Sequence, residues 1–216
     1  MSPDQLPQAT PAAPLGRART SAKRGRPGYD RETLLRVCVE VFNHRGYEAT
    51  SMGVLAEELG ISKSAIYHHV KSKEEILDAA LSHSLTELEG VVADAEALKA
   101  PAVVELETII RESINVLTRS LPHVTLLLRL RGNSEVETAA LFRRREITRR
   151  IAALIAQAQT DGDLRSDIDA RTASRLAMGM VNSIVDWYRP ERAESSAPVT
   201  DTVVNLLMGG LRTTFR

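Results

Sequence analysis

The chain has 216 residues, 43% of them hydrophobic, and its 28 basic and 28 acidic side chains give a formal net charge of zero. This composition excludes a wholly disordered chain, because it supplies enough apolar side chains to bury a core. The sequence contains no apolar run of about 18 residues and begins without the continuous apolar core of a secretory signal. We therefore expect a folded protein that stays in the cytoplasm and has no membrane partner.

Residues 1–28 are predicted to form a disordered basic arm. Arg24 and Arg26 close a segment that carries five basic residues and no acid between Arg17 and Arg26, among prolines and glycines that do not hold a helix. Two interpretations stay open. The arm is either a solubilising tail, or a flexible strand that follows phosphates or enters a narrow minor groove, in which case Arg24 and Arg26 bind DNA.

Residues 29–76 are predicted to form a helix-turn-helix DNA-binding domain. Asp30 is a plausible N-cap for a first helix over about 30–45, and Thr50 or Ser51 caps a second helix that Gly60 ends. Ser62 then caps a third helix. In that helix Ile66 and Val70 point inward, and the outer surface is left to Lys63, Ser64, Tyr67, His68 and His69.

The third helix is predicted to read DNA. Two short helices joined by a tight turn place the second of them in a major groove. Lys63 and Ser64 then donate hydrogen bonds to bases, whereas Tyr67 and the histidines donate to phosphates. Lys73, at the start of the next helix, is placed to reach a phosphate. The alternative is a generic helical bundle with two polar helices.

Residues 77–216 are predicted to form a helical ligand-binding and dimerisation domain, so the whole chain is expected to be all-α. A long amphipathic helix covers about 75–98, and the next covers 101–120. Another restarts at Pro122 and closes at Gly132, and one more runs from about 135 to 160. A helix capped by Asp169 ends before Pro190, and a final apolar helix follows it.

The last two helices are predicted to pair with their copies in a four-helix homodimer interface. Small residues in the first of them would let another helix approach closely: Ala173, Ala177, Gly179 and Ser183. The last helix carries enough apolar side chains for a partner. An ordinary internal core is the alternative interpretation.

Apolar side chains of this domain are candidates to line a ligand tunnel: Leu126, Leu127, Leu130, Phe142, Met178 and Trp187. Asn182 is either a ligand hydrogen-bond donor or a core amide. The run "RRREITRR" (143–150), which includes Arg145, is either a phosphate-binding patch at the mouth of the pocket or a solvated helix face with local acidic partners such as Glu137 and Glu146. A plain core is the alternative for the apolar set.

The stretch "FNHRGYEATSMGVLAEELGISKSAIYHHVKSKEEIL" (42–77) resembles the DNA-binding segment of the tetracycline-repressor (TetR) family of bacterial regulators. The resemblance implies phosphate contacts from Ser51, Tyr67, His69 and Lys73, with base contacts from Lys63, Ser64 and His68. Gly53 departs from the pattern, because some members place a base-reading side chain there. In "GMVNSIVDWYRP", "DGDLRSDID" and "RRREITRR" the chain also resembles the subset of the family that senses acyl-CoA thioesters.

We therefore expect a ligand-responsive transcriptional regulator. The favoured form is a repressor that binds a palindromic double-stranded DNA operator as a homodimer and is released by a small apolar effector, with an acyl-CoA thioester as the candidate. An architectural DNA-binding protein without an effector is the second hypothesis. The sequence predicts no enzyme, cofactor or metal site, because it lacks a Gly-rich phosphate loop, metal-ligand spacing among its histidines, and a nucleophile with an evident base.

Overall fold

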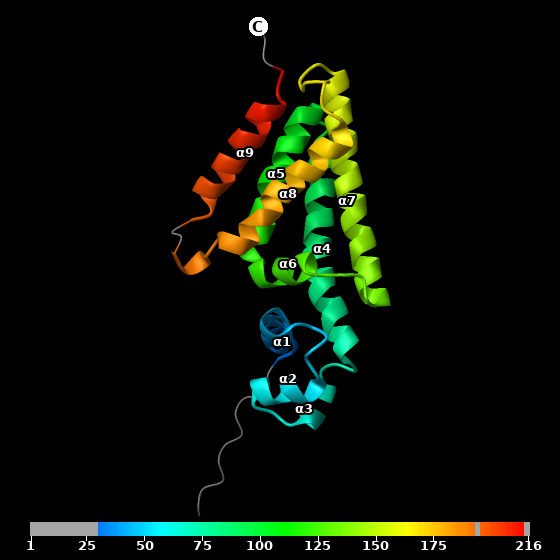
Figure 1. Cartoon of the computed structure of the whole chain (residues 1–216), viewed down its shortest axis with the longest axis vertical. Coiled ribbons are helices and arrows are strands. Elements are labelled where there is room, and N and C mark those ends of the chain that lie inside the picture. Colours follow the sequence, from blue (N-terminus) through cyan, green and yellow to red (C-terminus); the bar gives the residue numbers. More distant parts are fainter. Residues whose placement is uncertain (1–29, 193–194, 214–216) are drawn as a thin grey trace, which may run out of the picture.

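The computed structural model describes residues 30–192 and 195–213, and over these ranges the chain is helical without a sheet (Figure 1). The predicted all-α fold is confirmed. Residues 1–28, with Arg24 and Arg26, lie outside the described residues. The helices are α1 (Arg31–Arg45), α2 (Met52–Leu59), α3 (Lys63–Tyr67), α4 (Lys73–Ala97), α5 (Ala102–Arg119), α6 (Leu121–Leu128), α7 (Glu135–Thr160), α8 (Ala170–Trp187) and α9 (Ala197–Leu211), with a 3-10 turn at Pro190–Arg192.

Helices α1–α3 form a small unit at one end of the molecule, which we call the reading head (Figure 1). Its boundaries follow the predicted caps. Asp30 accepts the Thr33 N–H at 2.7 Å to begin α1, and Ser51 accepts the Val54 N–H to begin α2. Thr50 has another role, since its hydroxyl donates to the Gly46 carbonyl. The core of the head consists of fully buried apolar side chains from all three helices: Leu34, Cys38, Phe42, Leu55, Leu59 and Ile66.

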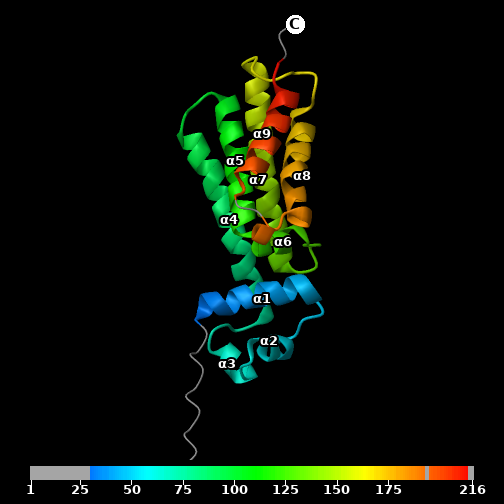
Figure 2. The same ribbon diagram turned by 90° about the vertical axis from the view of Figure 1, so that its left-hand side faces the viewer.

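Helix α4 begins beside the reading head and runs up into the larger part of the molecule, α4–α9, which we call the body (Figures 1 and 2). It begins at the Ser72 cap and packs on α1 below and on α5, α6 and α7 above. Because the predicted domain boundary at 76/77 lies inside α4, the two parts share one continuous helix. No helix among the described residues is long and apolar enough to cross a bilayer.

Helix α6 ends at Leu128 and not at Gly132, so the predicted end of this helix is wrong. The reason is the buried carboxylate of Glu137. One of its oxygens accepts the backbone N–H groups of Arg131, Gly132 and Asn133 at 3.1, 2.8 and 3.1 Å. These amides are therefore satisfied in a loop, and the positive φ of Gly132 (86°) lets the chain turn there.

Replacing Glu137 by Ala is expected to lower the free energy of unfolding by about 2–3 kcal/mol, because three part-buried hydrogen bonds lose their acceptor at once. Urea denaturation followed by circular dichroism measures this loss. Glu135→Ala is the matched control, since Glu135 lies in the same first turn of α7 but is exposed. Equal stability of the two variants would contradict the prediction.

Candidate functional site

Helix α3 presents its polar side chains to solvent at the end of the molecule farthest from α9 (Figure 1). Ser62 begins the helix by accepting the Ala65 N–H, and Ile66 anchors it in the core of the head. The predicted DNA-binding residues of this segment lie at or near the surface: Lys63, Ser64, Tyr67 and His68 are exposed, and His69 is half-buried. With 47% of its surface accessible, Tyr67 is one of the large side chains that the fold leaves uncovered.

The other two predicted phosphate contacts lie at helix starts near α3. Ser51 is exposed, although its hydroxyl already caps α2. Lys73 is more constrained, because its ammonium group donates to the Tyr47 carbonyl at 3.0 Å and lies 4.1 Å from the centre of the Tyr47 ring. Burial, with smaller contributions from Glu74, Glu48 and Glu137, raises the pKa of Tyr47 to about 12. Tyr47 thus stays neutral, and Lys73 is held in place at the start of α4.

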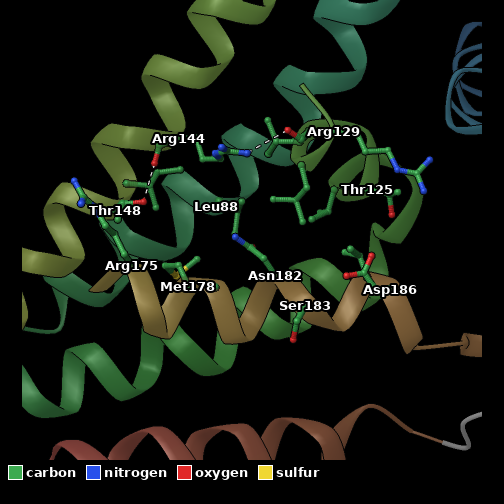
Figure 3. Close-up of a pocket in the computed structure, with 16 residues that line it drawn as sticks. Leu88, Thr125, Arg129, Arg144, Thr148, Arg175, Met178, Asn182, Ser183 and Asp186 are labelled. Carbon is green, nitrogen blue, oxygen red and sulfur yellow. Dashed lines mark hydrogen bonds between the residues drawn. The ribbon is translucent and has the colours of Figure 1, made fainter. Parts of the chain in front are cut away.

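A cavity of about 590 Å³ lies in the body between α4, α6, α7 and α8 (Figure 3). Three of the predicted ligand-binding residues line it: Leu127, Met178 and Asn182. The rest of its apolar lining comes mainly from Leu88, Val124, Leu128, Ile147 and Val185. In Figure 3 the Asn182 side chain points from α8 across the cavity toward Leu88. An amide among apolar walls gives the cavity a hydrogen-bonding group at its centre.

Five of the predicted ligand-binding residues do not line this cavity: Leu126, Leu130, Phe142, Arg145 and Trp187. Phe142 and Trp187 are 58% and 55% exposed on the outside of the body, and Leu126 is buried in the core. Helical geometry explains the error on α7. Its inner face carries Ala140, Ile147 and Ile151, so residues 142 and 145 project away from it.

Most of the arginines of α7 are tied to acidic side chains. Arg143 makes two hydrogen bonds to the Glu89 carboxylate at 2.8 and 2.7 Å, and Arg150 makes two to Glu96 at 2.9 and 2.6 Å. Hydrogen bonding to these guanidinium groups lowers the pKa of both carboxyls. These side chains fasten α7 to α4. The interpretation as a helix face with local acidic partners fits Arg149, which pairs with Glu146 at 2.9 Å. It does not describe Arg143 and Arg150, whose partners lie on α4.

Arg144 differs from its neighbours. It lies on the inner face of α7, lines the cavity, and makes one long hydrogen bond, 3.4 Å, to the Leu127 carbonyl (Figure 3). Burial, and to a smaller degree the charge of Arg145, lowers its pKa. Within the described part of the chain neither Arg144 nor Arg175, which also lines the cavity, has a carboxylate at ion-pair distance. The cavity thus combines apolar walls with two arginines that have no carboxylate at ion-pair distance, and it also has one carboxylate, Asp186, in its lining.

The sequence indicates that Arg144 faces the interior, although the predicted ligand-binding residues included Arg145 in its place. Residues 140, 144, 147 and 151 follow the spacing of the buried stripe of α7, which separates Arg144 from Arg143 and Arg145. The same spacing on α8 brings Arg175, Met178, Asn182 and Val185 to one face. A basic residue that falls on the apolar stripe of a helix, with no acidic residue four positions away, is therefore the sequence pattern that indicates a cavity-lining cation.

The outer face of α8 and α9 is apolar and uncovered in the single chain. Leu176, Met180 and Trp187 of α8 and Leu206 of α9 are exposed large side chains. Gly179 and Ser183 are exposed between them, as a closely approaching helix requires, but Ala173 and Ala177 are buried inside the chain's own core. Only two of the four small residues that were expected at an interface therefore lie on this face.

Two family models match the chain. Residues 34–80 match the model described as "Bacterial regulatory proteins, tetR family", and residues 99–211 match "Tetracyclin repressor-like, C-terminal domain". Together these segments contain the reading head from Leu34 onward and nearly all of the body. The match extends beyond the segment that resembled the family in sequence.

Known proteins resemble the chain along most of its length. The HTH-type transcriptional repressor KstR2 of Rhodococcus jostii is 27% identical over 202 residues, covering 89% of this chain and 94% of that protein. A solved member of the TetR transcriptional regulator family from Streptomyces coelicolor A3 is 48% identical, with a TM-score of 0.78, covering 91% of this chain and 96% of the other. AibR, solved in complex with isovaleryl coenzyme A and operator DNA, is 24% identical with a TM-score of 0.71, covering 82% and 97%.

Proposed function

The chain belongs to the TetR family of bacterial regulatory proteins, and from this premise we propose that it is a repressor that binds a palindromic operator as a homodimer and leaves it when an apolar, anionic effector fills the cavity. The observation that carries the effector part of the proposal is the cavity itself, with apolar walls, a central amide and arginines that lack acidic partners.

The DNA part of the proposal rests on the exposed face of α3. Lys63 and Ser64, at the start of this helix, are the base-reading residues, because the N-terminal residues of a recognition helix meet the base edges. Tyr67, His69, Ser51 and Lys73 contact phosphates on either side, and His68 lies at the end of the helix. Arg24 and Arg26 of the basic arm add contacts to the DNA backbone or minor groove.

The dimer part rests on the exposed apolar face of α8 and α9. Two copies that bury this face against each other form a four-helix interface related by a two-fold axis. The same axis then relates the two α3 helices, so the operator is expected to be palindromic, with half-sites one DNA turn or a multiple apart.

For the effector we propose an acyl-CoA thioester. Its acyl chain suits the apolar walls, and its phosphates suit guanidinium groups such as those of Arg144 and Arg175. The likeness to AibR, whose structure contains isovaleryl coenzyme A, supports this class of ligand. The proposal revises the expected residue set: Arg144 takes the place of Arg145, while Leu127, Met178 and Asn182 remain.

The experiment that tests the proposed function is a footprint of the purified protein on DNA from upstream of its own gene. We expect protection of a palindrome whose half-sites are centred about 10 base pairs, or a multiple of this, apart. Protection spread evenly along the DNA at all concentrations would instead support an architectural protein that binds without a specific operator.

Two substitutions on α3 are expected to have different effects on DNA recognition. Lys63→Ala should cost about 1–3 kcal/mol on the operator and relax the preference at one base position, because a base-edge contact is lost. Tyr67→Phe should lower the affinity for all DNA sequences by about the same factor, because a phosphate contact carries no sequence information. Fluorescence anisotropy on the operator and on single-base variants measures both. A uniform loss for Lys63→Ala would remove Lys63 from the base readers.

A further inference from the structure

Asn43, in the last turn of α1, connects the reading head to one wall of the cavity. Its side-chain Nδ2 donates to the Pro122 carbonyl at 2.7 Å, and its own carbonyl accepts from Nη1 of Arg129 at 2.7 Å. Pro122 lies in the first turn of α6 and Arg129 directly follows the last residue of that helix. Both ends of α6 are therefore tied to a single residue of α1.

Helix α6 also forms one wall of the cavity, through Val124, Thr125, Leu127 and Leu128, and Arg129 directly after it continues this wall. In Figure 3 the Arg129 side chain extends away from Asn182 and Met178, toward the side where the blue ribbon of α1 appears. Residues 121–129 thus face the cavity on one side and hold Asn43 on the other. A ligand that displaces this short helix must either pull Asn43 with it or break both hydrogen bonds.

On its other side α1 is part of the core of the head. Leu34, Cys38 and Phe42 of α1 are fully buried, and α1 packs on α2, which packs on α3. A close-packed core transmits a displacement instead of absorbing it. Movement of α1 with α6 therefore changes the orientation of α3 relative to the body. Figures 1 and 2 both show α1 directly below α6.

The chemistry of Asn43 indicates that its role is positional. Its side-chain Oδ1 is buried and has no hydrogen-bond partner in the described structure, which is an unfavourable arrangement for a carbonyl oxygen. An apolar side chain of similar shape would remove this unpaired oxygen, but it would leave the Pro122 carbonyl without the Nδ2 donor. The feature that such a side chain would lack is the bond to Pro122.

We propose that Asn43 is the positioning residue that couples occupancy of the cavity to the orientation of α3, by making α1 follow α6. The proposal rests on the proposed function, and it names the route by which the effector changes DNA binding. Allosteric coupling is a ratio of affinities that is reciprocal between the two sites, so it is measurable from the ligand side and from the DNA side.

The test compares the full-length wild type with Asn43→Leu, which keeps the number and branching of the side-chain heavy atoms, and with Asn43→Asp, which keeps the shape and removes the Nδ2 donor. The control is Arg36→Gln, on the same helix, where Arg36 is exposed and, among the residues that the structure describes, its side chain is bonded to Glu40 of α1 alone. Each protein is assayed for operator affinity with and without saturating isovaleryl-CoA, octanoyl-CoA and palmitoyl-CoA, for thioester affinity without DNA, and for amide hydrogen exchange of residues 121–129 with and without operator.

We expect both Asn43 variants to keep their thioester affinity within about twofold and their operator affinity within about threefold, while the factor by which thioester weakens operator binding falls at least about fivefold. Operator DNA should slow amide exchange in residues 121–129 of the wild type and of Arg36→Gln, but not of the Asn43 variants. Asn43 variants that retain both the full release factor and the slowed exchange would overturn the proposal.

Failure of the proposed function gives a different result. A wild type that binds its operator and no thioester refutes the proposed effector, and the exchange experiment with DNA alone then still decides the role of Asn43. A change of stability alone, without a change in the release factor or in exchange, would assign Asn43 to the fold and overturn the coupling role.

Discussion

Leu206→Glu is expected to convert the dimer into monomers and to lower operator affinity at least about 100-fold. Leu206 is 62% exposed on α9, in the apolar face that also contains Leu176, Met180 and Trp187 of α8. If this face forms the interface, a carboxylate there is buried against the apolar side chains of the other copy without a partner. A monomer then binds one half-site and loses the gain from linking two reading heads.

Sedimentation velocity and anisotropy on the operator measure these two effects on the same sample. Leu98→Glu is the matched control, because Leu98 is also an exposed leucine, 58% accessible, but lies at the end of α4 outside α8 and α9. It should leave both the dimer and operator binding unchanged. A Leu206→Glu protein that sediments as a dimer would contradict the assignment of this face to the interface.

Arg144→Leu is expected to weaken effector binding about 100-fold, or by roughly 2–3 kcal/mol, because a charge-assisted contact to an anion in a partly buried site is lost. Operator affinity without effector should stay the same, since Arg144 lies in the body. The variant should also be at least as stable as the wild type. Arg144 is half-buried with one long hydrogen bond, of 3.4 Å, and burial lowers its pKa.

The neighbouring residue supplies the control with the opposite outcome. Arg143→Leu removes two hydrogen bonds to Glu89 and contacts to Ser82 and Thr86, so it should destabilise the fold by about 1 kcal/mol and leave effector affinity intact. Isothermal calorimetry with the thioester and thermal melts of both variants complete the comparison. Loss of effector binding in Arg143→Leu but not in Arg144→Leu would place the anion outside the cavity.

The reading head could be predicted largely from the sequence, because its determinants are local. The third helix is shorter than predicted, since α3 ends at Tyr67 and leaves His69 and Val70 beyond it. Asp30, Ser51 and Ser62 are N-caps that act within three residues, and Gly60 ends α2 with a left-handed conformation. The outward set on α3 follows from the inward position of Ile66 alone. Such features need no knowledge of the tertiary structure. The end of α6 was mispredicted because the acceptor for its following amides, Glu137, belongs to the next helix.

The cavity was predicted less well, because it is formed by four helices, and local sequence patterns do not reveal how these helices pack against one another. Aromatic character favoured Phe142 and Trp187, yet both are exposed, and Trp187 belongs to the α8 and α9 face. The sequence analysis also treated the arginines of residues 143–150 as one group with a single role. The structure separates them: Arg143 and Arg150 pair with α4, whereas Arg144 lines the cavity. The acidic partners lie 54 residues away in sequence, which no local pattern reveals.

The central claim is that a ligand in the cavity controls operator binding, and fluorescence anisotropy tests it most directly. The purified protein is titrated onto DNA from upstream of its own gene at fixed salt, with and without a panel of acyl-CoA thioesters and with free CoA as the control. The account predicts release by at least one thioester and not by free CoA, and loss of that release in Arg144→Leu. Tight operator binding that no thioester weakens, or equal release from the wild type and Arg144→Leu, would contradict it.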